Sequence, residues 1–65
     1  MAQARRTYAV NTPFGLNVRE KPSTDAPILR VLPDGQKITA DNAAKPPKGW
    51  KALEDGGFVM FQFLK

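Results

Sequence analysis

Short runs of alternating apolar and polar residues, separated by turn-forming residues, fill most of this chain. No run of helical length has apolar residues at the i, i+3, i+4 and i+7 positions that one face of a helix needs. Alternation between turns is typical of strands in a small all-β domain. The pattern predicts strands at residues 7–10, 16–18, 28–32, 36–40, 50–53 and 58–64.

Turn-forming residues separate these strands. Pro33–Gly35 and Glu54–Gly57 have the sequences of tight turns, in which Gly35 and one of Gly56 or Gly57 are predicted to hold a positive φ. Five or six short strands are too few for a sandwich, whereas a small, strongly bent barrel closes a sheet without open edges. We therefore expect an all-β fold with one barrel domain at residues 7–65. Residues 1–6 have no apolar pattern and are predicted to form a flexible tail.

The composition argues against catalysis and against a cofactor. The 65 residues allow one domain. The chain has no Cys and no His, which excludes disulfides and the usual thiolate or imidazole metal ligands. It has one Ser, and its acidic residues have no spacing that demands an acid–base pair. No apolar run approaches the roughly 18 residues of a membrane span. We expect a non-catalytic protein that needs no cofactor and no metal.

Two stretches resemble the bacterial SH3-like (Src homology 3) domains. GLNVREKPSTDAPILRVLPDGQKI, at residues 15–38, is similar to that family's Leu-Asn-Val-Arg motif, Pro-Ser loop and turn glycine. GWKALEDGGFVMFQFL, at residues 49–64, is similar to its Gly-Trp strand and its terminal aromatic-Leu pair. The chain departs from the family at Phe58, where Trp or Tyr is usual, and in the stiff, basic KPPKG before Trp50. The resemblance implies a small SH3-like barrel.

The predicted core of this barrel comes from the apolar positions of the strands. The sequence and the resemblance place there Val18, Ile38, Leu53, Phe58, Val59, Phe63 and Leu64.

The resemblance also implies a binding module. Its ligand would be a peptide or a peptidoglycan component of the bacterial cell envelope. Two alternatives stay open: a module for assembly with another protein, and a weak binder of nucleic acid or another polyanion, since the net charge of +4 favours anionic partners. We expect a monomer. It belongs to the envelope or the cell exterior if the chain is cut from an exported parent, and to the cytoplasm if it is the whole protein.

Three aromatic residues are candidates for a ligand groove. The resemblance identifies REKPSTDAP, at residues 19–27, as an arm over the barrel that borders this groove. It places Trp50 on the side away from Leu53, between this arm and the loop at residues 42–49; a structural cap is the other role open to Trp50. Tyr8 and Phe61 are further candidates for the same groove.

Arg19 stands at the start of the arm. Its guanidinium suits a ligand carboxylate, but a simpler role is to cover the barrel or to pair with Glu20 or Asp25.

The window from residue 42 to residue 51 has three lysines, Lys45, Lys48 and Lys51, and no acidic residue. Cations interleaved with an aromatic residue can hold phosphates and stack a base. A solvated loop is the simpler interpretation, and dedicated nucleic-acid domains have denser basic patches. A nucleic acid is therefore the less favoured partner.

Overall fold

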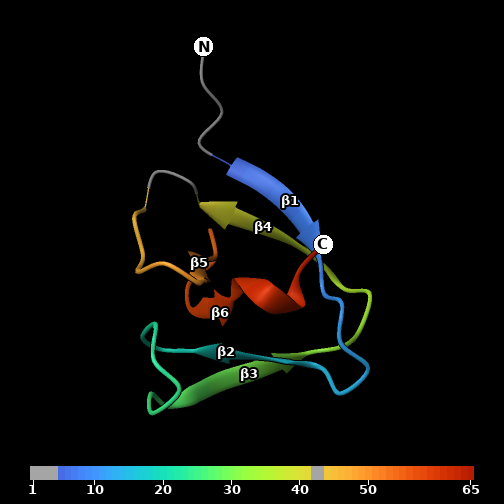
Figure 1. The fold of residues 1–65 in the computed structure, drawn as a ribbon, viewed down its shortest axis with the longest axis horizontal. Helices are drawn as coiled ribbons and strands as arrows, with labels where there is room; N and C mark the ends of the chain where they lie inside the picture. The colour runs from blue at the N-terminus through green and yellow to red at the C-terminus, as the bar shows by residue number, and fades with distance from the viewer. Residues whose placement is uncertain (1–4, 42–43) are drawn as a thin grey trace.

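Six short antiparallel strands form the part of the chain that the structure describes, residues 5–41 and 44–65 of a computed structural model (Figure 1). The elements are β1 (Arg5–Ala9), β2 (Leu16–Arg19), β3 (Ile28–Leu32), β4 (Lys37–Asp41), β5 (Trp50–Ala52), β6 (Phe58–Met60) and the 3-10 turn η1 (Phe61–Phe63). β1 pairs with β4, and the other strands form a sheet in the order β3-β2-β6-β5. The expected all-β fold is confirmed. No helix within these two ranges is long and apolar enough to cross a membrane.

The core lies between the two sheets. Figure 1 shows the β1–β4 pair and the β2–β3 pair on opposite sides of the molecule, with β6 and η1 between them. A bridge between Ala40 and Leu53 links the sheets. Val18 and Val59 have no exposed surface. The buried cluster consists of Val10, Leu16, Val18, Ile38, Leu53 and Val59, with Tyr8, Leu32, Phe63 and Leu64 packed against it.

Phe58 is the exception among the predicted core residues. It precedes the fully buried Val59, and successive side chains of a strand point to opposite faces of the sheet. Phe58 is half-buried on the other face, opposite Ala52 and Arg19. The continuous apolar run of this segment gave no sign of which residues face inward.

The predicted strand at residues 58–64 is wrong beyond Met60. β6 ends there because Met60 lies opposite Trp50, the first residue of β5, so the ladder between these strands is complete. η1 then turns the chain toward β1. Lys65 and Ala9 exchange two backbone hydrogen bonds of 2.9 Å at that strand. The 3-10 turn therefore carries the C-terminal residues from one sheet to the other.

The N-terminal boundary of the fold also differs from the prediction. Arg5 and Arg6, assigned to the tail, are the first residues of β1 and pair with Asp41 and Ala40 of β4. Backbone pairing with β4 extends the strand where the side chains give no apolar signal. Residues 1–4 of the predicted tail lie outside the described residues.

The predicted positive φ angles at the tight turns are confirmed. Gly35 has φ 86° and Gly57 has φ 93°. The two positions differ in their surroundings: a Cβ on Gly35 would meet no atom within 4 Å, whereas a Cβ on Gly57 would overlap Cγ1 of Val18. Gly57 therefore serves both a left-handed backbone and a close approach of β6 to β2.

We predict that Val18→Ala lowers the free energy of unfolding by about 2–4 kcal/mol, because truncation of a fully buried side chain leaves a cavity. Val31, which is 58% exposed, provides a matched control. Val31→Ala should change stability by less than about 0.5 kcal/mol. Denaturant melts of both variants test the assignment, and equal losses at the two positions would contradict it.

A second prediction separates strain from overlap at the turns. Gly35→Ala should cost about 1 kcal/mol through backbone strain alone. Gly57→Ala should cost about 2–4 kcal/mol, since the overlap with Val18 adds about 1–3 kcal/mol to a similar strain. Chemical unfolding of both variants gives the comparison. Equal losses of stability in the two variants would show that Val18 moves away from the new Cβ at residue 57 without a further loss of stability.

Candidate functional site

One face of the four-stranded sheet points away from the core. Opposite residues of an antiparallel pair have their side chains on the same face. Lys51 lies opposite the fully buried Val59, so this pair faces inward. Trp50 and Met60 form the neighbouring pair and therefore share the outer face. On this face the half-buried Trp50 side chain lies beside Met60.

A hollow of about 240 Å³ continues this face beyond Met60. Its lining combines the loop before β2, three residues of β2, and residues of β6 and η1. These residues are Thr12, Phe14, Gly15, Leu16, Asn17, Arg19, Met60 and Phe63. We call the surface formed by Asn17, Arg19, Trp50, Met60 and Phe63 the outer groove.

The outer groove differs in position from the groove expected from the sequence. The expected groove lay between the arm and the loop at residues 42–49, and residues 42–43 of this loop lie outside the described residues. The hollow at the outer groove is lined instead by β2, by β6 and by the segment that precedes β2. Neither Met60 nor Asn17 was predicted at the groove, and Phe63 was predicted in the core, against which it packs. Counting outward from the predicted turn at Glu54–Gly57 would have placed Met60 opposite Lys51. In the structure the Leu53 amide bonds the Gly57 carbonyl oxygen, and this shift of one residue brings Met60 opposite Trp50.

Arg19 holds the arm in place at the edge of the outer groove. Its Nη1 donates a hydrogen bond of 2.9 Å to the carbonyl oxygen of Ala26, a buried residue of the arm. The amide of Glu20 donates to the carbonyl oxygen of Pro27, also at 2.9 Å. The partner of Arg19 is thus a backbone carbonyl, not the carboxylate of Glu20 or Asp25 that the sequence suggested. Arg19 has a positioning role, and it also lines the hollow.

Tyr8, Lys51 and Phe61 meet at a second place, which we call the cation–aromatic cluster. The two rings are 5.7 Å apart with an interplanar angle of 84°, an edge-to-face arrangement. The Lys51 ammonium lies 5.8 Å from the centroid of Tyr8 and 5.2 Å from that of Phe61. Both distances are within the range of cation–π attraction. β1, β5 and η1 each supply one member of this cluster.

The structure therefore divides the predicted site residues between two surfaces. Trp50 and Arg19 belong to the outer groove, whereas Tyr8 and Phe61 belong to the cation–aromatic cluster together with Lys51. Lys45 and Lys48 are exposed. The sequence interpretation assigned Tyr8 and Phe61 to the groove of Trp50, because nothing in the sequence shows that β1 and η1 meet β5 on the face that Lys51 occupies.

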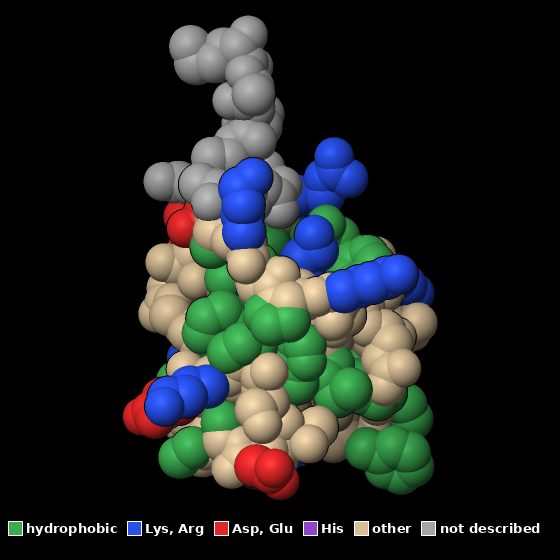
Figure 2. All heavy atoms as spheres, turned by 60° about the vertical axis from the view of Figure 1, so that its left-hand side comes forward, with side chains coloured by type: hydrophobic (Ala, Val, Ile, Leu, Met, Phe, Trp, Pro, Cys, Tyr) green, Lys and Arg blue, Asp and Glu red, His purple; other side chains and the backbone are tan. Residues whose placement is uncertain are grey.

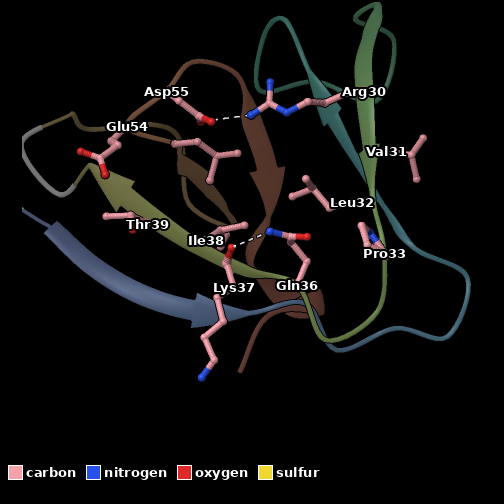
Figure 3. A pocket seen from close by; sticks show the side chains of 11 residues that line it. Arg30, Val31, Leu32, Pro33, Gln36, Lys37, Ile38, Thr39, Glu54 and Asp55 are labelled. Carbon is pink, nitrogen blue, oxygen red and sulfur yellow. Dashed lines mark hydrogen bonds and ion pairs between the residues drawn. The ribbon is translucent and has the colours of Figure 1, made fainter.

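A larger hollow, of about 520 Å³, lies elsewhere, between β3, β4 and the turn that joins β5 to β6 (Figure 3). Leu32, Ile38 and Leu53 are among its lining residues. An ion pair of 3.0 Å between Arg30 and Asp55 crosses it, and the two side chains are 38% and 73% exposed. Its lining includes charges of both signs and no aromatic residue. It offers a less distinctive ligand surface than the outer groove.

The chemistry available at the outer groove is that of binding. Trp50, Met60 and Phe63 offer apolar surface, and an aromatic ring adds a rigid contact area. The amide of Asn17 both donates and accepts hydrogen bonds, as a peptide backbone requires. Within residues 5–41 and 44–65, no three His, Cys, Asp or Glu side chains are grouped so that they could hold a metal ion.

We predict that Arg19→Met loosens the arm. The variant keeps an apolar stem but removes the bond to Ala26, which should cost about 1–2 kcal/mol of stability and speed hydrogen exchange at the Glu20 amide. Arg30→Met is the matched control, because the partly exposed pair with Asp55 should contribute about 0–1 kcal/mol. An unchanged exchange rate at Glu20 in Arg19→Met would rule out the positioning role.

Comparison with known protein families identifies the family of the chain. The chain matches the family described as the Bacterial SH3 domain over residues 15–50, more than half of its length. Comparison with curated proteins and with solved structures gives no match. The matched range runs from the start of β2 to the first residue of β5 and includes the whole arm. SH3 domains are generally non-catalytic binding modules. The chain belongs to the bacterial SH3 domain family.

Proposed function

We propose that this domain binds an extended peptide of the bacterial cell envelope, such as a peptide of peptidoglycan, along the outer groove. The observation that carries the proposal is the pairing of Trp50 with Met60 on the outer face, next to the hollow that Asn17 and Arg19 line. Pockets that combine apolar walls with a few convergent polar groups are the usual form of a ligand site.

The apolar and the polar side chains of the outer groove have different roles in this proposal. The Trp50 indole gives a large rigid contact and an N–H donor, and Trp is enriched among residues that dominate binding energy. Met60 adapts its shape to the ligand because its side chain is unbranched and flexible. Asn17 hydrogen-bonds the ligand backbone. The Arg19 guanidinium has five N–H donors, and the hydrogen bond to the Ala26 carbonyl oxygen uses one of them. The guanidinium can therefore also donate to a ligand carbonyl or carboxylate.

The surroundings of the groove reduce the entropy that binding would cost. The arm is closed by its own hydrogen bonds, including one of 3.1 Å from the Asp25 amide to Oγ of Ser23. On the other side, Pro46 and Pro47 stiffen the loop that leads into Trp50. A preorganised site loses less conformational freedom when the ligand arrives.

A separate observation favours a second candidate, assembly with another protein. β3 is an edge strand of its sheet and carries three apolar residues that are at least half exposed. These residues are Ile28, Leu29 and Val31, and Phe14, in the loop before β2, is exposed as well. Exposed apolar patches of this kind mark interaction surfaces.

We predict that Trp50→Ala removes ligand binding while leaving the fold intact, because Trp50 lies outside the buried cluster. Binding is measured by sedimentation with purified peptidoglycan sacculi and by titration of the ¹⁵N-labelled domain with peptidoglycan stem peptides. Trp50→Phe should keep part of the affinity, since it retains an aromatic contact. Phe61→Leu, which removes an aromatic ring on the other side of β5, should bind as the parent domain does.

The titration also separates the two candidates. Amide shifts centred on Asn17, Trp50 and Met60 are expected for the groove. If saturating stem peptide moves none of these amides, or if Trp50→Ala binds sacculi as tightly as the parent domain, the peptide proposal fails. Shifts confined to Ile28–Leu32 on addition of a partner protein would favour assembly instead.

A further inference from the structure

We propose that the cation–aromatic cluster of Tyr8, Lys51 and Phe61 is a second site, separate from the outer groove, that binds single-stranded nucleic acid. The separation follows from the register of β5. Trp50 pairs with Met60 on the outer face, and Lys51 pairs with Val59 on the inner face. Neighbouring residues of one strand thus belong to surfaces on opposite sides of the sheet.

The position of the Lys51 ammonium is well defined. The side chain starts on the core-facing side of β5, opposite Val59, and its ammonium lies within 6 Å of the centroids of two rings that are nearly perpendicular. Contact with both rings restricts the rotamers of a side chain that is otherwise highly flexible. A cation held in this way loses less entropy when it pairs with a phosphate.

Phe61 supplies an aromatic surface beside this cation. It is 44% exposed. Its amide donates a 2.8 Å hydrogen bond to the carbonyl oxygen of Gly49, which ties η1 to the residue that follows Lys48. Tyr8 supports the ring edge-to-face from β1. The cluster thus presents an exposed, anchored ring, the kind of platform on which an unpaired base stacks.

Further positive charges lie on the segments next to the cluster in the chain. Arg6 is exposed and lies on the same face of β1 as Tyr8, two residues earlier. Lys48 is exposed in the turn that ends at Trp50, directly before the Gly49 carbonyl that holds Phe61. The sequence from residue 42 to residue 53 has no acidic residue. In Figure 2, most of the Lys and Arg side chains on the visible face lie in its upper half, above a hydrophobic area.

The combination of ring and cations favours a single-stranded nucleic acid over other anions. A repeating phosphate backbone can contact several separate cations, whereas its bases need an aromatic face to stack on. An acidic peptide or a base-free polyphosphate would use the cations but would have no base to place on Phe61. The dependence of binding on Phe61 is therefore the feature that distinguishes this ligand.

Fluorescence anisotropy with labelled oligothymidylate and oligouridylate of about ten nucleotides tests the site on the full chain. Phe61→Leu keeps an apolar side chain but removes the aromatic face, and Phe14→Leu makes the same change at a position that is 92% exposed. Lys51→Gln and Lys37→Gln remove the same charge at two places. Lys37 is an exposed residue on the face of β4 opposite to Ile38, so it points away from the core-facing side.

Phe61→Leu should weaken oligonucleotide binding about tenfold, and Phe14→Leu should have no effect. Lys51→Gln should reduce the slope of log K against log salt by about 0.7, the value for one lost phosphate contact on a single strand, while Lys37→Gln leaves the slope unchanged. Trp50→Ala should bind the oligonucleotide as the parent domain does, which makes this result independent of the peptide proposal.

Three results would overturn the inference. The first is no oligonucleotide binding at a salt concentration of about 50 mM. The second is inorganic polyphosphate competing as strongly as the oligonucleotide while Phe61→Leu has no effect, which would mean a charge patch without stacking. The third is an equal loss of oligonucleotide affinity in Lys51→Gln and Lys37→Gln, which would mean that net charge alone attracts the ligand. Thermal melts of Phe61→Leu confirm that its loss of binding is not unfolding.

Discussion

The close approach of β6 to β2 at Gly57 and Val18 is the contact on which the rest of this domain depends. β2 and β6 share a single register pair, Arg19 with Phe58, so the ladder that joins them is very short. Gly57 lies one residue before that pair, where a Cβ would overlap Val18. The absence of a side chain at residue 57 lets Val18 and Val59 bury completely in the same core. In a domain of this size, few other side chains are available to bury.

The same contact builds the candidate ligand surface. Because β6 lies against β2, Met60 reaches the hollow lined by Asn17 and Arg19. Trp50 joins this surface from β5 through its pairing with Met60. The groove residues are thus brought together by the closure that completes the core. Stability and binding therefore share one structural cause in this domain, although they use opposite faces of the sheet.

β5 shows how a strand of three residues can serve two surfaces. Trp50 lies on the outer face and Lys51 on the inner face, where its stem starts near the core and its ammonium reaches the rings of Tyr8 and Phe61. The hydrogen bond from the Phe61 amide to the Gly49 carbonyl connects the residue before β5 to η1. A change at either residue of β5 should therefore affect one surface and spare the other.

Local features of the chain could be predicted from the sequence alone. The strand at residues 28–32 and the positive φ at Gly35 follow from alternation and turn chemistry, which depend on neighbouring residues only. The sequence also carried the family resemblance. It did not reveal the end of β6 at Met60, the exposure of Ile28 and Val31, or the meeting of Tyr8 with Lys51 and Phe61. These depend on where a partner strand ends, on which strand lies at a sheet edge, and on which face each residue takes. Such properties are decided only when segments far apart in the chain pack together, because strand pairing and burial are long-range interactions.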